Sequence, residues 1–125
     1  WWSLGISLYE MLTGFPPFMG ENQHILQGKI LKDKIRLPPF LSRDAHSLLK
    51  GLLQKDANKR LGNGPTGSEE IKGHKWFRSI NWKKLEAREI QPSLVPQITG
   101  KQCITNFQEC CTNLPVIDSP ASSPR

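Results

Sequence analysis

The sequence predicts a mainly α-helical protein that ends in an irregular C-terminal tail. Through about the first 90 residues, apolar side chains recur at helical spacing, and residues typical of helix caps precede several of these runs. No segment shows the sustained alternation of apolar and polar residues that marks a half-buried strand. Farther on the periodicity fades and prolines recur, so we expect residues 91–125 to form a tail without a core of its own.

The first predicted helix covers residues 1–13 and is apolar on nearly every side. A helix that is hydrophobic all round belongs inside a larger structure. We therefore expect Trp1 to lie within a longer protein, of which this sequence is a C-terminal fragment. Gly14 follows the helix at a position where a left-handed turn suits glycine, and Pro16 and Pro17 prevent the helix from continuing.

Two further helices and a connector are predicted before residue 55. Residues 22–32 form a short amphipathic helix, and residues 35–41 form an extended connector that contains two prolines. Ser42 is a good N-cap for the next helix, and Asp44 suits the positive end of its dipole. The apolar side chains of this helix recur at helical spacing: Ala45, Leu48, Leu49, Leu52 and Leu53.

A polar loop over residues 55–67 has the glycine spacing of a dinucleotide-binding fingerprint. That fingerprint works when a strand delivers the glycines to a helix N-terminus, and no strand precedes them here. We interpret the loop as a turn between two helices. Ser68 is predicted to cap a helix that runs through Ile71 towards Trp76, and a last helical turn is predicted over residues 82–85.

The charge distribution favours an ordinary solvated surface. The chain has 17 Lys and Arg against 11 Asp and Glu, a net charge of +6. Such an excess can indicate nucleic acid or an anionic membrane as the partner. The excess is spread along the chain and no run exceeds two adjacent cations, so we expect neither partner. No apolar run is long enough to span a bilayer.

The cysteines, Cys103, Cys110 and Cys111, are odd in number and lie late in the chain. The adjacent pair cannot form a disulfide without strain, and no histidine lies near at zinc-ligand spacing. We interpret them as reduced intracellular thiols. None of the histidines has a Ser or Cys arranged beside it as a nucleophile, so none is assigned a catalytic role: His24, His46 and His74.

Four motifs, in this order, resemble those of protein kinases. Residues 1–5 (WWSLG) resemble the D-x-W-S-x-G motif without its leading Asp, and residues 9–18 resemble the continuation of that helix and its proline loop. Residues 55–62 (KDANKRLG) resemble the late motif with a nearly invariant arginine, and residues 71–77 resemble the H-x-W-F signature. The resemblance implies that residues 1–77 are the C-terminal part of the kinase helical lobe.

The tail resembles that of one kinase group. Residues 90–96 resemble the P-x-x-x-P start of the C-terminal tail of AGC kinases, and Asn106-Phe107 resembles the N-F motif of that tail. Residues 115–120 resemble the turn-motif phosphorylation site of the ribosomal-protein S-six kinases, in their plant-like form. The resemblance implies an incomplete AGC-kinase tail over residues 78–125.

The resemblance also implies roles for individual residues. Glu10 would accept an arginine of the substrate peptide; the alternative is an internal ion pair. Arg60 would pair with the glutamate of an A-P-E motif that precedes this sequence. Phe107 would contact the adenine of ATP, the alternative being simple packing on the lobe. Ser119 and Ser123, each followed by a proline, are candidate phosphorylation sites.

Two positions depart from the kinase pattern. Ser7 stands where relatives carry a large aliphatic residue that supports the stack beneath the adenine. A hydroxyl there leaves a void or needs a partner, so we expect weaker support and lower activity of the parent enzyme. Cys110-Cys111 also replaces the polar or aromatic residues that are more usual there.

The implied parent enzyme uses ATP and Mg²⁺ to phosphorylate protein substrates that carry basic residues upstream of Ser or Thr. The resemblance also implies an upstream activating kinase and a location in the cytoplasm or nucleus. The glycine-rich loop, the strand-borne Lys and the catalytic and metal-binding motifs do not occur in this sequence. We therefore predict that the chain alone binds neither cofactor, has no catalytic residue or metal ligand, and is inactive. The alternative is a non-catalytic helical interaction module derived from a kinase.

Overall fold

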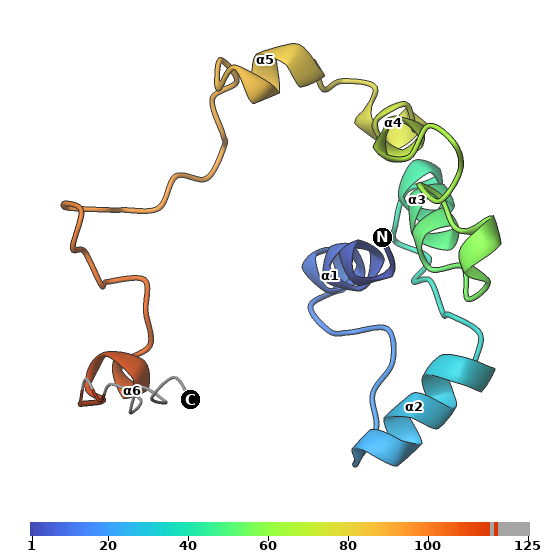
Figure 1. Cartoon of the computed structure of the whole chain (residues 1–125), viewed down its shortest axis with the longest axis horizontal. Helices are drawn as coiled ribbons and strands as arrows, with labels where there is room; N and C mark the ends of the chain where they lie inside the picture. The colour runs from blue at the N-terminus through green and yellow to red at the C-terminus, as the bar shows by residue number, and fades with distance from the viewer. Residues whose placement is uncertain (116, 118–125) are drawn as a thin grey trace, which may run out of the picture. The chain divides into compact units, whose positions relative to one another are not determined.

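A computed structural model describes residues 1–115 and 117 of the chain. The regular structure of these residues is helical and contains no strand, which confirms the predicted mainly α class (Figure 1). The chain forms two compact units, Trp1–Glu89 and Ile90–Arg125. The first unit therefore extends past residue 77, the boundary that the motifs suggested, and the division of the chain into domains stays a prediction.

Helix α1 (Trp2–Thr13) ends where the sequence predicted. Gly14 has the left-handed conformation (φ 85°), and its N–H donates to the carbonyl of Glu10 at 2.7 Å. Only one side of α1 is buried, through Gly5, Leu8 and Tyr9. Other apolar side chains of α1 are exposed, with Met11 at 73%. The expectation that a longer protein covers these sides stays a prediction.

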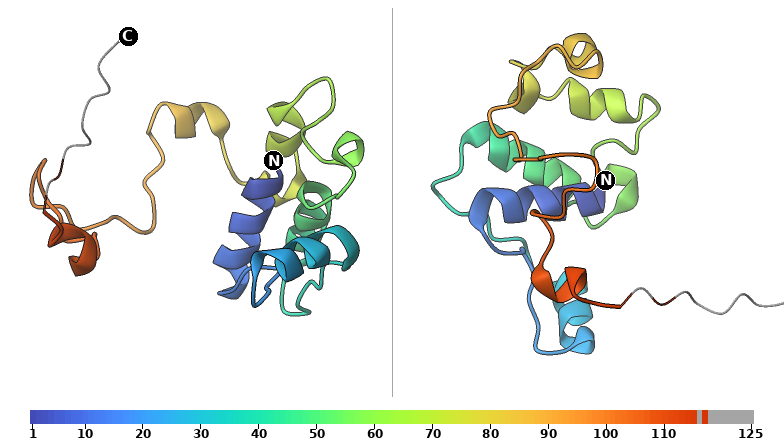
Figure 2. Two further views of the ribbon diagram at one scale, coloured as in Figure 1. Left: turned by 60° about the horizontal axis from the view of Figure 1, so that its bottom comes forward. Right: turned by 90° about the vertical axis from the view of Figure 1, so that its left-hand side faces the viewer.

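The core forms where α1 packs on helix α3 (Arg43–Leu52), and the two lie side by side in Figure 2. The Ser42 hydroxyl accepts the Ala45 N–H at 3.1 Å, which confirms the predicted N-cap. The helices approach closely at Gly5, where a Cβ atom would lie 2.8 Å from Leu53 Cδ2. Among the residues that the structure describes, the largest fully buried side chains come from α3: Leu48, Leu49 and Leu52.

Helix α2 (Gln23–Lys32) confirms the second predicted helix but buries none of its residues. Asn22 Oδ1 accepts the Ile25 N–H at 3.0 Å and so caps the helix. The connector that follows has no helix or strand from residue 33 to residue 38. It is held to the core because the Tyr9 hydroxyl donates to the carbonyl of Arg36 at 2.8 Å.

The region after α3 is built from short pieces: a 3₁₀ turn η1 (Ala57–Lys59), helix α4 (Ser68–Lys72), a 3₁₀ turn η2 (Lys75–Phe77) and helix α5 (Trp82–Glu86). Helix α5 confirms the predicted last turn, whereas the start and the end of α4 were predicted wrongly.

Ser68 does not cap α4, because it is already the first helical residue. The N-cap is Gly67, whose positive φ of 55° turns the chain into the helix without a side-chain bond. The helix also ends at Lys72 and does not continue to Trp76. His74 adopts an extended conformation there, and its side chain caps the separate turn η2.

In the second unit, the described residues form one short helix, α6 (Glu109–Thr112), which the sequence pattern did not predict. No described residue after Ile90 is buried. This confirms the expectation of a tail without a core of its own, as far as the chain is described.

Candidate functional site

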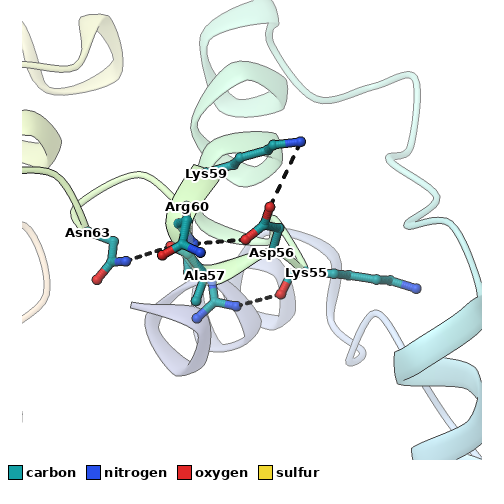
Figure 3. Close-up of polar contacts among 7 residues, drawn as sticks. Lys55, Asp56, Ala57, Lys59, Arg60 and Asn63 are labelled. Carbon is teal, nitrogen blue, oxygen red and sulfur yellow. Dashed lines mark hydrogen bonds and ion pairs between the residues drawn. The ribbon is translucent and has the colours of Figure 1, made fainter.

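Arg60 is anchored in the turn that follows α3 (Figure 3). Its Nη2–H donates to the Lys55 carbonyl at 3.1 Å, as Figure 3 shows. Its Nε–H donates to the Gln54 carbonyl at 2.9 Å. The guanidinium carbon lies 5.3 Å from the ring centroid of Trp2 on α1. Arg60 is half-buried as a residue, and these contacts hold its guanidinium between the end of α3 and the start of α1.

The residues around Arg60 hold the turn in shape. Asp56 Oδ1 accepts the Asn58 N–H at 3.0 Å and so caps η1, and the Asn63 amide donates to the Ala57 carbonyl at 2.7 Å (Figure 3). The Asp56 carboxylate pairs with Lys59 at 3.8 Å. Within the described residues no ion pair includes Arg60, so the carboxylate partner implied by the kinase resemblance stays a prediction.

Glu10 is exposed in the last turn of α1. The described part of the chain gives its carboxylate no ion-pair partner. The internal ion pair considered as the alternative therefore has no partner among residues 1–115 and 117. The role of Glu10 in accepting a substrate arginine stays a prediction, because no substrate is present.

Ser7 is also exposed on α1, where its hydroxyl can contact water. An exposed hydroxyl needs no protein partner, so Ser7 leaves no unsatisfied group in this structure. Whether it weakens the enzyme that the resemblance implies stays a prediction.

Phe107 lies in the second unit with 66% of its surface exposed. Its N–H donates to the Ile104 carbonyl at 2.9 Å, and the neighbouring Asn106 amide donates to the Gln97 carbonyl at 3.4 Å. The proposed contact with adenine is not tested by this arrangement. The other tail candidates, Ser119 and Ser123, lie outside the described residues.

The glycine-rich loop has a structural role. The Trp1 indole donates to the Gly62 carbonyl at 3.0 Å, and the Gly62 N–H donates to the Glu70 carboxylate at 3.0 Å. Gly62 has a φ of 90°, and a Cβ atom there would lie 2.6 Å from the Trp1 ring. The Glu70 carboxylate already accepts the Gly62 N–H and would repel a phosphate. The backbone donor of the loop is therefore used within the protein and not for a nucleotide.

Sequence reasoning missed that His74 lies beside a serine in space, 3.0 Å from the Ser47 hydroxyl through Nε2. His74 Nδ1 accepts the Trp76 N–H at 3.1 Å, so the neutral ring carries its proton on Nε2. That nitrogen donates to Ser47 and cannot take its proton, which is the opposite of nucleophile activation. Ser47 is therefore near His74 but not arranged as its nucleophile, and the assignment of no catalytic role to His74 stays a prediction.

The cysteines of the tail are free thiols, and the Sγ atoms of Cys110 and Cys111 lie 3.8 Å apart. A hydrogen bond with the Thr105 hydroxyl, at 3.2 Å, is the main cause that lowers the pKa of Cys103 to about 6.

The described residues contain no cluster of three side chains able to hold a metal ion. Their helices are also too short or too polar to cross a membrane.

Comparison with known proteins gives consistent matches. Residues 1–77 match the family model described as protein kinase domain. The chain is 67% identical over 124 residues to serine/threonine-protein kinase AtPK2/AtPK19 of Arabidopsis thaliana, covering 99% of the chain and 26% of that protein. It is 64% identical over 123 residues to AtPK1/AtPK6 of the same plant, covering 98% of the chain and 26% of the relative.

A mammalian protein matches at lower identity. The cAMP-dependent protein kinase catalytic subunit PRKX of Mus musculus is 44% identical over 108 residues, which cover 86% of this chain and 30% of that protein. The chain therefore spans about a quarter of the length of the plant relatives that it matches, at 26% of each.

Proposed function

The chain belongs to the protein kinase family, and from that premise we propose that it forms the C-terminal part of the helical lobe of an ATP-dependent protein serine/threonine kinase. The observation that carries this proposal is the match of residues 1–77 to the kinase domain. It is supported by the way the fold uses the matched residues: Gly5 allows the close packing of two helices, and Arg60 anchors a turn.

The tail motifs assign the parent enzyme to the AGC group and, within it, to the plant-like ribosomal-protein S-six kinases. Phosphorylation of Ser119 and Ser123 regulates this enzyme by adding charge and strong hydrogen-bond acceptors to the tail. An upstream kinase activates it in the cytoplasm or nucleus. Mass spectrometry of the cellular protein tests the two sites, and unmodified serines under all conditions would contradict this part.

Glu10 contributes substrate selection in this proposal. An exposed carboxylate without an ion-pair partner among the described residues is free to accept a guanidinium from a substrate. Bidentate pairing of arginine with a carboxylate gives both energy and orientation. Protein substrates with basic residues upstream of the phosphorylated Ser or Thr fit this site.

Arg60 has a structural role in the proposal. Two of its N–H groups are used by backbone carbonyls, and the rest of the planar guanidinium remains for a carboxylate of the longer protein. The carboxylate of the A-P-E motif is the proposed partner. Arg60 thereby links the turn after α3 to the segment that binds the substrate.

The 125 residues alone are proposed to transfer no phosphate, because ATP and Mg²⁺ are held in this family by motifs that the sequence does not contain. The test compares this chain with the full-length product of its transcript in a radiolabelled ATP assay, using a serine peptide with upstream arginines. We expect phosphorylation by the longer protein only. Transfer by the 125 residues, or an inactive longer protein, would contradict the proposal.

The second candidate is a non-catalytic helical interaction module. The observation in its favour is that α1 and the N-cap residue before it present apolar side chains to solvent: Trp1, Leu4 and Met11. A full-length protein that binds partners but phosphorylates no peptide would support this candidate over the kinase.

A further inference from the structure

A cavity of about 720 Å³ lies within the first unit, between the end of α1, the loop that follows it and the C-terminal part of α2 with its connector. These segments can be followed from blue to cyan in Figure 2. Aromatic and proline side chains line part of the cavity, among them Phe15, Pro16 and Pro17. Its volume is that of typical ligand-binding pockets.

The other part of the lining is strongly basic. Lys29, Lys32, Lys34 and Arg36 all line the cavity, and Asp33 is the acidic residue among them. No ion pair within the described residues includes any of these four cations. Their charges therefore add to a positive potential over an apolar surface, which favours a ligand that is both anionic and apolar.

Long-range hydrogen bonds hold the basic wall in place. The Tyr9 hydroxyl donates to the Arg36 carbonyl at 2.8 Å, and the Lys29 ammonium donates to the Met19 carbonyl at 2.8 Å. The Tyr9 ring also packs edge-on against Phe15, with 6.3 Å between centroids. The site is preorganised by these contacts, so a ligand need not order the loop when it binds.

We propose that this cavity docks an acidic peptide segment of a partner protein. An apolar side chain of the peptide packs on Phe15 and the adjacent prolines, while its carboxylates face Lys32, Lys34 and Arg36. Nucleic acid and anionic membranes also bind cationic sites through their phosphates. A surface of phosphates, however, offers no side chain that could pack on the aromatic and proline residues of the cavity, so we favour a peptide. The site differs from Glu10, which attracts cations, and it does not require phosphotransfer.

The test uses the full-length protein that carries these residues and a short fluorescein-labelled peptide, rich in Asp and Glu around one Trp. We expect fluorescence anisotropy to show that this peptide binds the protein. A control peptide in which Asn and Gln replace Asp and Glu should not bind. The double variant Lys32→Glu, Lys34→Glu should weaken binding about tenfold or more. The matched control, Lys83→Glu with Lys84→Glu on the exposed face of α5, makes the same charge change away from the cavity.

A second measurement needs no variant. Bound acidic peptide should protect Lys32 and Lys34 from chemical acetylation in the wild-type protein, with Lys83 modified as before. Equal weakening by the two double variants, or absence of protection, would overturn the proposal in favour of general charge attraction. Displacement of the peptide by duplex DNA or phosphatidylserine vesicles, with the same lysines protected, would assign the site to those ligands and also overturn it.

Discussion

The guanidinium of Arg60 lies over the indole of Trp2, with 5.3 Å between the guanidinium carbon and the ring centroid. This contact joins the turn after α3 to the start of α1, two segments far apart in the sequence. The same guanidinium donates to two successive carbonyls, those of Gln54 and Lys55. Arg60 therefore has a structural role within this chain, apart from any partner in a longer protein.

Arg60→Leu should destabilise the 125-residue chain by about 1–3 kcal/mol, because two carbonyls lose charged donors and the contact with Trp2 is lost. In the full-length protein the loss should be larger, about 3–5 kcal/mol, if a buried carboxylate also loses its partner. Urea unfolding measures both. Lys59→Leu is the control, since its side chain is exposed and makes one surface ion pair. Equal losses in the two proteins would contradict the proposed pair.

Glu10→Gln should reduce the preference of the full-length kinase for peptides with an upstream arginine. The neutral amide keeps the shape but loses the charge that strengthens a bond to guanidinium. We expect kcat/KM to fall about tenfold for an arginine peptide and to stay unchanged for its alanine counterpart. Glu21→Gln, at another exposed carboxylate, serves as the control. An unchanged ratio of the two peptides would exclude the role.

Gly5→Ala should destabilise the core by about 1–3 kcal/mol through overpacking. The added Cβ would lie 2.8 Å from Leu53 Cδ2 and 2.9 Å from Leu52 Cβ. Gly28→Ala in α2 is the matched control, because nothing lies within 4 Å of its Cβ, and alanine there should stabilise the helix by about 0.5–1 kcal/mol. Thermal unfolding followed by circular dichroism compares them, and equal melting temperatures would refute the close approach of α1 and α3.

Cys103 should react with iodoacetamide at neutral pH as a thiolate. Its pKa is lowered to about 6, mainly by the hydrogen bond with the Thr105 hydroxyl, so alkylation should lose half its rate near pH 6 and level off above pH 7. Thr105→Val should move this midpoint upward, towards the usual pKa of about 8.5, while Thr105→Ser should keep it low. Alkylation of the Cys103 peptide, followed by mass spectrometry across pH, checks this, and identical profiles would rule it out.

Phe107→Ala should raise the KM for ATP of the full-length kinase by about tenfold, with little change in kcat, if the ring contacts the adenine. Phe40→Ala is a suitable control. The Phe40 side chain is 69% exposed, close to the 66% of Phe107, and it lies on the connector before α3. Steady-state kinetics with varied ATP separates the two constants. A KM that stays at the wild-type value would favour simple packing of Phe107.

Several elements were predictable because their signals are local. The helical spacing of Leu48, Leu49 and Leu52 predicted α3, and a serine at position 42 predicted its start. Both signals are local, because the Ser42 hydroxyl only has to reach the N–H three residues later. Gly14 likewise predicted the end of α1. Where two local signals compete, prediction fails: Ser68 looks like a cap, but the positive φ of Gly67 already starts the helix.

By itself, the sequence determined the helical class, the strongest helix boundaries and the kinase motifs, because propensities and capping act between residues three or four positions apart. Only the tertiary structure decided which side of α1 is buried, which carbonyls hold Arg60, and that His74 lies beside Ser47. It also brought four cations of α2 and its connector to one cavity. Such contacts depend on how distant segments pack, and no local spacing in the chain specifies that packing.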